Sequence, residues 1–138
     1  MTLMQPPHNS GPFAAFWQSF VVLPLWVKLW VGLLSTVNMA SLAFINQPSG
    51  SLIAALVFAG IGLSMIAAIY CGGLSRLVGL GHIIAWMPLI FILVFSPPLA
   101  TGAYSAYLTL LLVINTVSLV FDINDFRLWL AGERAVFA

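Results

Sequence analysis

Four long apolar runs, none of which contains an acidic residue, constrain the fold of this chain more than any other feature. They cover about 24–45, 51–71, 77–95 and 103–121. A helix that crosses the hydrocarbon core of a bilayer needs about 20 residues at about 1.5 Å each, and every run is close to that length. Because lipid offers the backbone no hydrogen bonds, and because the runs lack the alternation of β-barrel strands, the pattern predicts four membrane-spanning helices.

The scarcity of charge excludes several classes of protein. Only 5% of the 138 residues are charged and 62% are hydrophobic, whereas soluble domains contain about 25% charged residues. A chain this small needs a charged shell to remain dissolved. The composition therefore excludes a soluble domain, a disordered chain and a nucleic-acid binder, and the single Cys71 excludes an internal disulfide.

Short breaks separate the apolar runs, at 46–50, 72–76 and 96–102, and they carry the Gly, Pro, Ser and Asn residues typical of turns. Helices joined by short loops pack as antiparallel neighbours. We therefore expect an all-α fold, an integral membrane four-helix bundle over 24–121.

Two further segments flank the predicted bundle. Within the N-terminal segment 1–23, residues 12–20 are apolar but too short to span, so we expect a short interfacial helix there with Ser10 as its N-cap. The C-terminal tail 122–138 begins as an amphipathic stretch. It either extends the fourth helix into water or turns along the membrane surface.

The basic residues indicate how the bundle is oriented. With four spans, both termini and the second loop lie on one side of the membrane, and the other two loops are uncharged. The positive-inside rule predicts that the charged side is cytoplasmic. We expect all five tryptophans at that interface and two tyrosines, Tyr104 and Tyr107, at the other. The charged side carries Lys28, Arg76, Arg127, Arg134, Asp122, Asp125 and Glu133, together with His8 and His82.

A rim of polar side chains at the charged side is the first candidate site. Asp122 and Asp125 are three residues apart and share a helix face, and we expect Asp122 to pair with Arg76. Such groups are capable of holding a metal or relaying protons, but they serve more often as ion pairs that fix helix ends. The basic groups also attract anionic lipid headgroups. The predicted interaction rim consists of Arg76, His82, Asp122, Asp125 and Arg127.

The sequence offers no catalytic, cofactor-binding or metal-binding residues that we would assign. His82 with Cys71 has no recognisable zinc-ligand spacing. Phosphate-binding loops, nucleophile elbows and metalloprotease motifs are absent from the sequence.

A polar pair at mid-membrane depth is the second candidate site. Asn38 and Ser41 in the first span, and Asn115 and Ser118 in the fourth, both read N-x-x-S-L. Buried amides in lipid form interhelical hydrogen bonds worth about 0.6 kcal/mol on average. The side chains therefore serve either as structural contacts between helices or protomers, or as the polar lining of a substrate path.

Small residues in the second span predict close helix packing. They recur every four residues in two series. A further feature, Pro88 inside the third span, predicts a kink, because proline removes one backbone hydrogen bond. The first series is Gly60, Ser64, Ala68 and Gly72, and the second is Ser51, Ala55 and Ala59.

Two patterns carry a resemblance to a known group of proteins. The run R-L-x-G-L-x-H ending at His82, and the D-x-x-D run from Asp122 followed by G-E-R at 132–134, resemble those of small bacterial inner-membrane proteins with four predicted spans and no established activity. The resemblance covers the chain from about Pro24 onward. It implies a bacterial inner-membrane location and the four-span topology, and no catalytic residues.

These observations predict a non-enzymatic membrane protein with both termini in the cytoplasm. We expect an accessory or oligomerising subunit, in a homo-oligomer or a larger membrane complex, whose rim docks a partner or lipid headgroups. The alternative is a small oligomeric transporter or channel with a path lined by Asn38, Ser41, Asn115 and Ser118.

Overall fold

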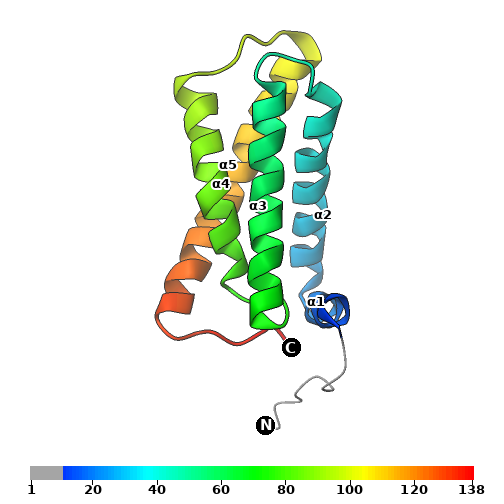
Figure 1. Cartoon of the computed structure of the whole chain (residues 1–138), viewed down its shortest axis with the longest axis vertical. Helices are drawn as coiled ribbons and strands as arrows, with labels where there is room; N and C mark the ends of the chain where they lie inside the picture. The colour runs from blue at the N-terminus through cyan, green and yellow to red at the C-terminus, as the bar shows by residue number, and fades with distance from the viewer. Residues whose placement is uncertain (1–10) are drawn as a thin grey trace.

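The computed structural model describes residues 11–138, and this part of the chain is built from helices without a β-strand (Figure 1). The four predicted spans correspond to helices long and apolar enough to cross a membrane. The predicted all-α, four-helix fold is thus confirmed, whereas Ser10 and His8 lie outside the described residues. The elements are α1 (Pro12–Val21), α2 (Leu25–Met39), the 3-10 helix η1 (Ala40–Phe44), α3 (Gly50–Cys71), α4 (Val78–Phe95) and α5 (Gly102–Leu130).

The helix α5 is longer than the predicted fourth span. It continues from Gly102 to Leu130, so the first part of the tail extends the helix instead of turning away from it. Its 29 residues span about 44 Å at 1.5 Å per residue, compared with about 30 Å for a hydrocarbon core. One end of α5 therefore projects beyond the apolar part of the bundle, and this end carries Asp122, Asp125 and Arg127.

The short helix α1 lies across one end of the bundle. Figure 1 views it almost along its own axis, while the four long helices run vertically. Phe13, Trp17 and Val21, spaced four residues apart, are all exposed along it. An exposed apolar stripe on a helix that crosses the bundle end is the arrangement expected of an interfacial helix.

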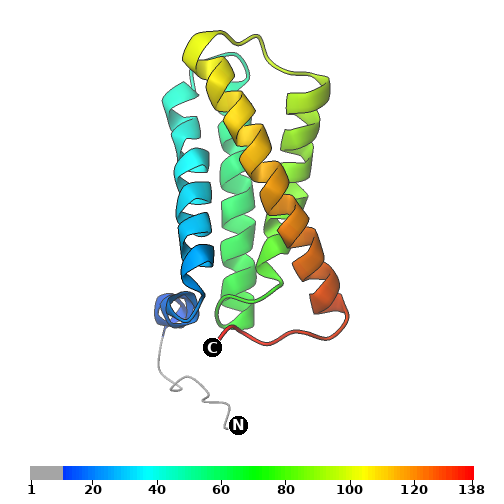
Figure 2. The same cartoon turned by 180° about the vertical axis from the view of Figure 1, so that it is seen from behind.

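The four long helices are not packed equally. In Figure 2, α5 crosses the bundle diagonally, from a position beside α2 at one end to a position beside α4 at the other. All buried residues of α2 lie in its second half, namely Leu34, Val37 and Asn38. By contrast, the buried residues of α3 are distributed from Gly50 to Ala68. The helix α2 therefore packs closely only at the end near η1.

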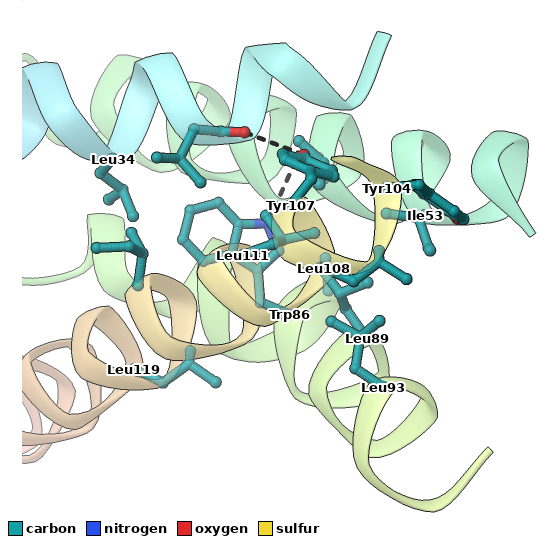
Figure 3. Close-up of a cluster of buried hydrophobic side chains, with 14 residues drawn as sticks. Leu34, Ile53, Trp86, Leu89, Leu93, Tyr104, Tyr107, Leu108, Leu111 and Leu119 are labelled. Carbon is teal, nitrogen blue, oxygen red and sulfur yellow. Dashed lines mark hydrogen bonds between the residues drawn. The ribbon is translucent and has the colours of Figure 1, made fainter. Parts of the chain in front are cut away.

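A cluster of large side chains forms the core between α3, α4 and α5 (Figure 3). Trp86, which we expected at the interface, is 1% exposed, and its indole N–H donates to the Val57 carbonyl at 3.3 Å. Tyr107, which we expected at the other interface, is buried within the protein, and its hydroxyl donates to the Val37 carbonyl at 3.0 Å. Both side chains satisfy their polar atom on a neighbouring backbone, which explains how they are accommodated in the core.

Small residues hold α3 against α4. A Cβ atom added to Gly60 would lie 2.2 Å from the indole nitrogen of Trp86, and one added to Gly81 would lie 2.3 Å from the backbone nitrogen of Ser64. The Ser64 hydroxyl also donates to the Val78 carbonyl at 2.8 Å. The two backbones therefore approach each other as closely as small residues allow, and Gly60, Ser64 and Ala68 face the inside of this molecule.

The remaining predicted packing residues have other positions. Gly72 is exposed with φ +73°, and it ends α3 while Gly73 N–H bonds back to the Ala68 carbonyl at 2.8 Å, so its role is that of a helix terminator. Pro88 is exposed on the outside of α4, and the helix continues through it. Of the second small-residue series, all three members face outward: Ser51, Ala55 and Ala59.

Candidate functional site at the charged end of the bundle

The loop between α3 and α4 is tied to α5 and to the C-terminal tail by one arginine. Arg76 forms ion pairs with Asp125 and with Glu133, and its Nε lies 3.1 Å from Glu133 Oε2. We expected Asp122 as the partner of Arg76, and that pairing is wrong. Asp125 lies one turn further along α5, and Asp122 already has another partner, so the guanidinium joins three segments of the chain.

That other partner is His82, which connects α4 with α5. Its Nδ1 lies 3.1 Å from Asp122 Oδ2, and the Ser118 hydroxyl donates to the same oxygen at 3.3 Å. The imidazole stacks on Trp86 with 4.0 Å between ring centroids. The His82 and Asp122 side chains are only 15% and 14% exposed, so this contact fixes the two helices where they leave the apolar region.

Gly79 permits this contact between α4 and α5. A Cβ atom at this position would lie 3.0 Å from the Cα, Cβ and Oδ1 atoms of Asp122. Gly79, the glycine of the R-L-x-G-L-x-H run, therefore has a packing role in this structure. Gly79 admits α5 on one side of α4, and Gly81 admits α3 on the other.

A small cap of chain segments, which no sequence pattern predicts, closes the charged end. The hydroxyl of Ser19 in α1 accepts the Leu74 N–H at 2.8 Å and donates to the Phe16 carbonyl at the same distance. Leu74 in turn accepts the Phe137 N–H at 2.9 Å, beside an antiparallel bridge between Ser75 and Val136. Through these contacts α1, the loop and the tail are joined although they are far apart in sequence.

Three of the four basic side chains at this end lack a carboxylate partner within residues 11–138. Lys28 donates to the Val21 carbonyl, and Arg127 donates to Asn124 Oδ1 at 3.1 Å. Arg134 lies over the ring of Trp129, 4.4 Å from its centroid. Arg76 and His82 engage all three acidic side chains, so Lys28, Arg127 and Arg134 face none of them, and the four basic residues at this end exceed the three acidic ones by one positive charge.

The predicted polar pair is brought together by the fold. Asn38 and Asn115 exchange two hydrogen bonds, of 2.8 and 3.0 Å, and Asn38 also donates to the Leu34 carbonyl at 2.9 Å. The two side chains are 1% and 0% exposed. Each amide thus satisfies the other between α2 and α5 of one molecule, which is the arrangement of a structural contact.

The two serines of the repeated pattern have different surroundings. Ser118 reaches toward Asp122, as described above, and takes no part in the amide pair. Ser41 lies in η1, is 1% exposed, and its hydroxyl has no hydrogen-bond partner in the described structure. The four residues therefore form one amide pair and two separate hydroxyl positions, and not a continuous polar surface.

Among residues 11–138, no three His, Cys, Asp or Glu side chains gather as metal ligands would. No family model, curated protein or solved structure matches this chain. The geometry of the charged end is therefore the main guide to function.

Proposed function

We propose that the chain is a non-enzymatic integral membrane protein of the bacterial inner membrane, an accessory or oligomerising subunit that docks through its charged end. The observation that carries this proposal is the unequal pairing of charges. All three carboxylates are engaged within the molecule, whereas Lys28, Arg127 and Arg134 are not opposed by any of them. An acidic surface of a partner protein, or anionic headgroups, would complement these cations.

The cap supports a docking role because it makes the charged end a defined surface. Ser19 holds α1 to the loop, and Arg76 holds the loop to α5 and to the tail. A rigid surface loses less conformational entropy on binding than a flexible tail does. The positive-inside rule supports a cytoplasmic position for this end.

The transport alternative has less support from the structure. Asn38 and Asn115, which would line a path, use their amide groups on each other and are fully buried. A path through these side chains would require the pair to open.

Gentle extraction followed by measurement of particle mass tests the docking role. We expect the wild-type chain to be recovered as an oligomer or with a partner protein. The variant Lys28→Gln/Arg127→Gln/Arg134→Gln should be recovered as a smaller particle, and the charge-conserving control Lys28→Arg/Arg127→Lys/Arg134→Lys should behave like the wild type. A wild-type particle with the mass of one chain in several detergents contradicts the proposal.

Cysteine labelling tests the orientation independently. In a Cys71→Ser background, Ala135→Cys at the charged end and Thr101→Cys at the other end offer two exposed positions. A membrane-impermeant maleimide added to intact cells should label Thr101→Cys and leave Ala135→Cys unlabelled. The reverse pattern contradicts a cytoplasmic charged end.

A further inference from the structure

Three segments of the cap meet at one glycine, Gly73, in the loop between α3 and α4. A Cβ atom at this position would lie 2.7 Å from Val136 Cγ1 in the C-terminal tail. The same atom would lie 3.2 Å from Ser19 Oγ and 3.3 Å from the Ala15 carbonyl oxygen, both in α1. Gly73 has φ +149°, a conformation that residues with a side chain rarely adopt. The loop therefore presents a bare backbone surface on which the tail and α1 both rest.

The tail crosses the loop as a non-helical strap, residues 133–137, and both Figure 1 and Figure 2 place the C-terminus beside the end of α3. Val136 forms an antiparallel bridge with Ser75, beside one further backbone hydrogen bond. The Glu133 side chain, which pairs with Arg76, is 55% exposed, and partly exposed ion pairs stabilise little. Because these contacts are few, local opening of the strap does not require the four long helices to unfold.

The position of α1 on the bundle end depends on the same loop. Ser19 is the one residue of this described helix that is buried, and its hydroxyl accepts the Leu74 N–H at 2.8 Å. The direction of that N–H is set by the backbone of Gly73, the preceding residue. When the strap detaches, Gly73 is no longer held by Val136, and the Leu74 N–H loses its fixed direction toward Ser19. The strap therefore stabilises the attachment of α1 through the loop.

The strap and α1 also position two of the basic side chains that face no carboxylate. The ammonium group of Lys28 donates to the Val21 carbonyl, the last residue of α1. Arg134 belongs to the strap, and its guanidinium lies over the ring of Trp129 at the end of α5. A shift of either segment therefore changes how these cations are placed relative to each other.

We infer that the strap and α1 form a coupled device, in which the seating of Val136 on Gly73 holds α1 against the end of the bundle. Binding of a partner to either segment shifts the other, because both share the loop and coupling between sites is reciprocal. As a regulator of the cations the device rests on the proposed docking role. The coupling itself is a property of the single chain and is measured without a partner.

Amide hydrogen exchange of the full chain, followed by NMR in lipid nanodiscs, tests the coupling. Val136→Asn replaces the apolar contact with Gly73 and should accelerate exchange of the α1 amides at least about fivefold, the lower limit of typical coupling between sites. The matched control is Ala135→Asn, at the adjacent exposed position of the strap, which should leave α1 unchanged. Wild-type exchange of α1 in Val136→Asn, or equal acceleration by both variants, overturns the proposal.

The reverse direction is tested from α1. Ser19→Ala removes the acceptor of the Leu74 N–H and should accelerate exchange of the Phe137 amide, which donates to the Leu74 carbonyl, by a similar factor. Gln18→Ala, at the exposed neighbouring position of α1, is the control and should leave the Phe137 amide protected. If Ser19→Ala loosens α1 alone, the two segments are attached independently and the proposal is wrong. Both effects in a chain that docks no partner would support the coupling and contradict only the docking role.

Discussion

Two helix interfaces of this molecule are held together by different contacts. One lies between α3 and α4, and the other lies between α2 and α5. Between α3 and α4, Gly81 allows the backbone of α4 to approach that of α3 at Ser64, and Gly60 makes room for the ring of Trp86. Between α2 and α5, the Asn38–Asn115 pair and the Tyr107 hydroxyl hold one half, and a groove separates the other half. In lipid, burial of apolar surface alone does not bring helices together. Close fit and polar bonds replace it, and each interface relies mainly on one of them.

The largest expected effect comes from disturbing the close fit. Gly81→Ala places a Cβ 2.3 Å from the backbone of Ser64, so α3 and α4 must separate. We expect a loss of about 3 kcal/mol in the free energy of unfolding, at the upper end of overpacking costs, measured by denaturation in mixed micelles. Gly62→Ala on α3, where nothing lies within 4 Å, is the control and should change stability by less than about 0.5 kcal/mol. Equal stability of the two variants would contradict the close fit.

The amide pair should give the next largest effect. Asn38→Leu leaves the Asn115 amide buried without its partner, which we expect to cost about 1–2 kcal/mol. The double variant Asn38→Leu/Asn115→Leu removes both amides and should be more stable than the single one. A thermodynamic cycle in mixed micelles measures this coupling, and strictly additive effects would show that the amides do not interact.

A smaller effect is expected for the hydroxyl that supports the same interface. Tyr107→Phe removes only the bond to the Val37 carbonyl, so we expect a loss of about 0.5–1 kcal/mol. Tyr70→Phe is the control, because Tyr70 is 81% exposed and should tolerate the change without measurable loss. If both variants are as stable as the wild type, the Tyr107 bond contributes nothing to the interface.

The contacts of the charged end should be weaker and should respond to salt. Arg76→Gln breaks the pairs with Asp125 and Glu133, whose side chains are 36% and 55% exposed. For partly exposed pairs we expect the free energy of unfolding to fall by less than about 1 kcal/mol. This loss should become smaller when the salt concentration is raised from about 0.05 to about 0.5 M, because salt screens such pairs. The Asn38→Leu loss, in contrast, should not depend on salt. An Arg76→Gln loss that is unaffected by salt would indicate packing instead of charge.

The sequence predicted the helices better than it predicted their contacts. The lengths of the apolar runs identified all four long helices, because a bilayer sets one narrow range of lengths. The sequence did not decide where α5 ends, because an amphipathic stretch is able either to extend the helix into water or to turn along the membrane surface. Trp86 was misplaced because we grouped it with the other tryptophans as interfacial, although it lies at the middle of the third span, and its contact with Gly60 explains its burial.

The sequence predicted which residues form the candidate sites, but it did not predict every contact between them. The repeated N-x-x-S-L pattern identified Asn38 and Asn115 before their contact was known, because an amide in an apolar span needs a partner. The partner of Arg76 was missed, because one turn of α5 separates Asp122 from Asp125 and the sequence does not fix the depth of the loop. The role of Ser19 was unpredictable for the same reason: its partner Leu74 is a backbone group in a distant loop.

Distances between spin labels in lipid nanodiscs test the difference between the two interfaces most directly. One pair, Leu29→Cys and Ile123→Cys, spans α2 and α5 near the charged end, and the other, Met65→Cys and Ile84→Cys, spans α3 and α4, all at exposed positions and in a Cys71→Ser background. We predict a broader distance distribution for the first pair, which broadens further when Asn38 and Asn115 are both changed to Leu, and a narrow distribution for the second pair that does not respond. Equally narrow distributions that both ignore the loss of the amides would contradict this account.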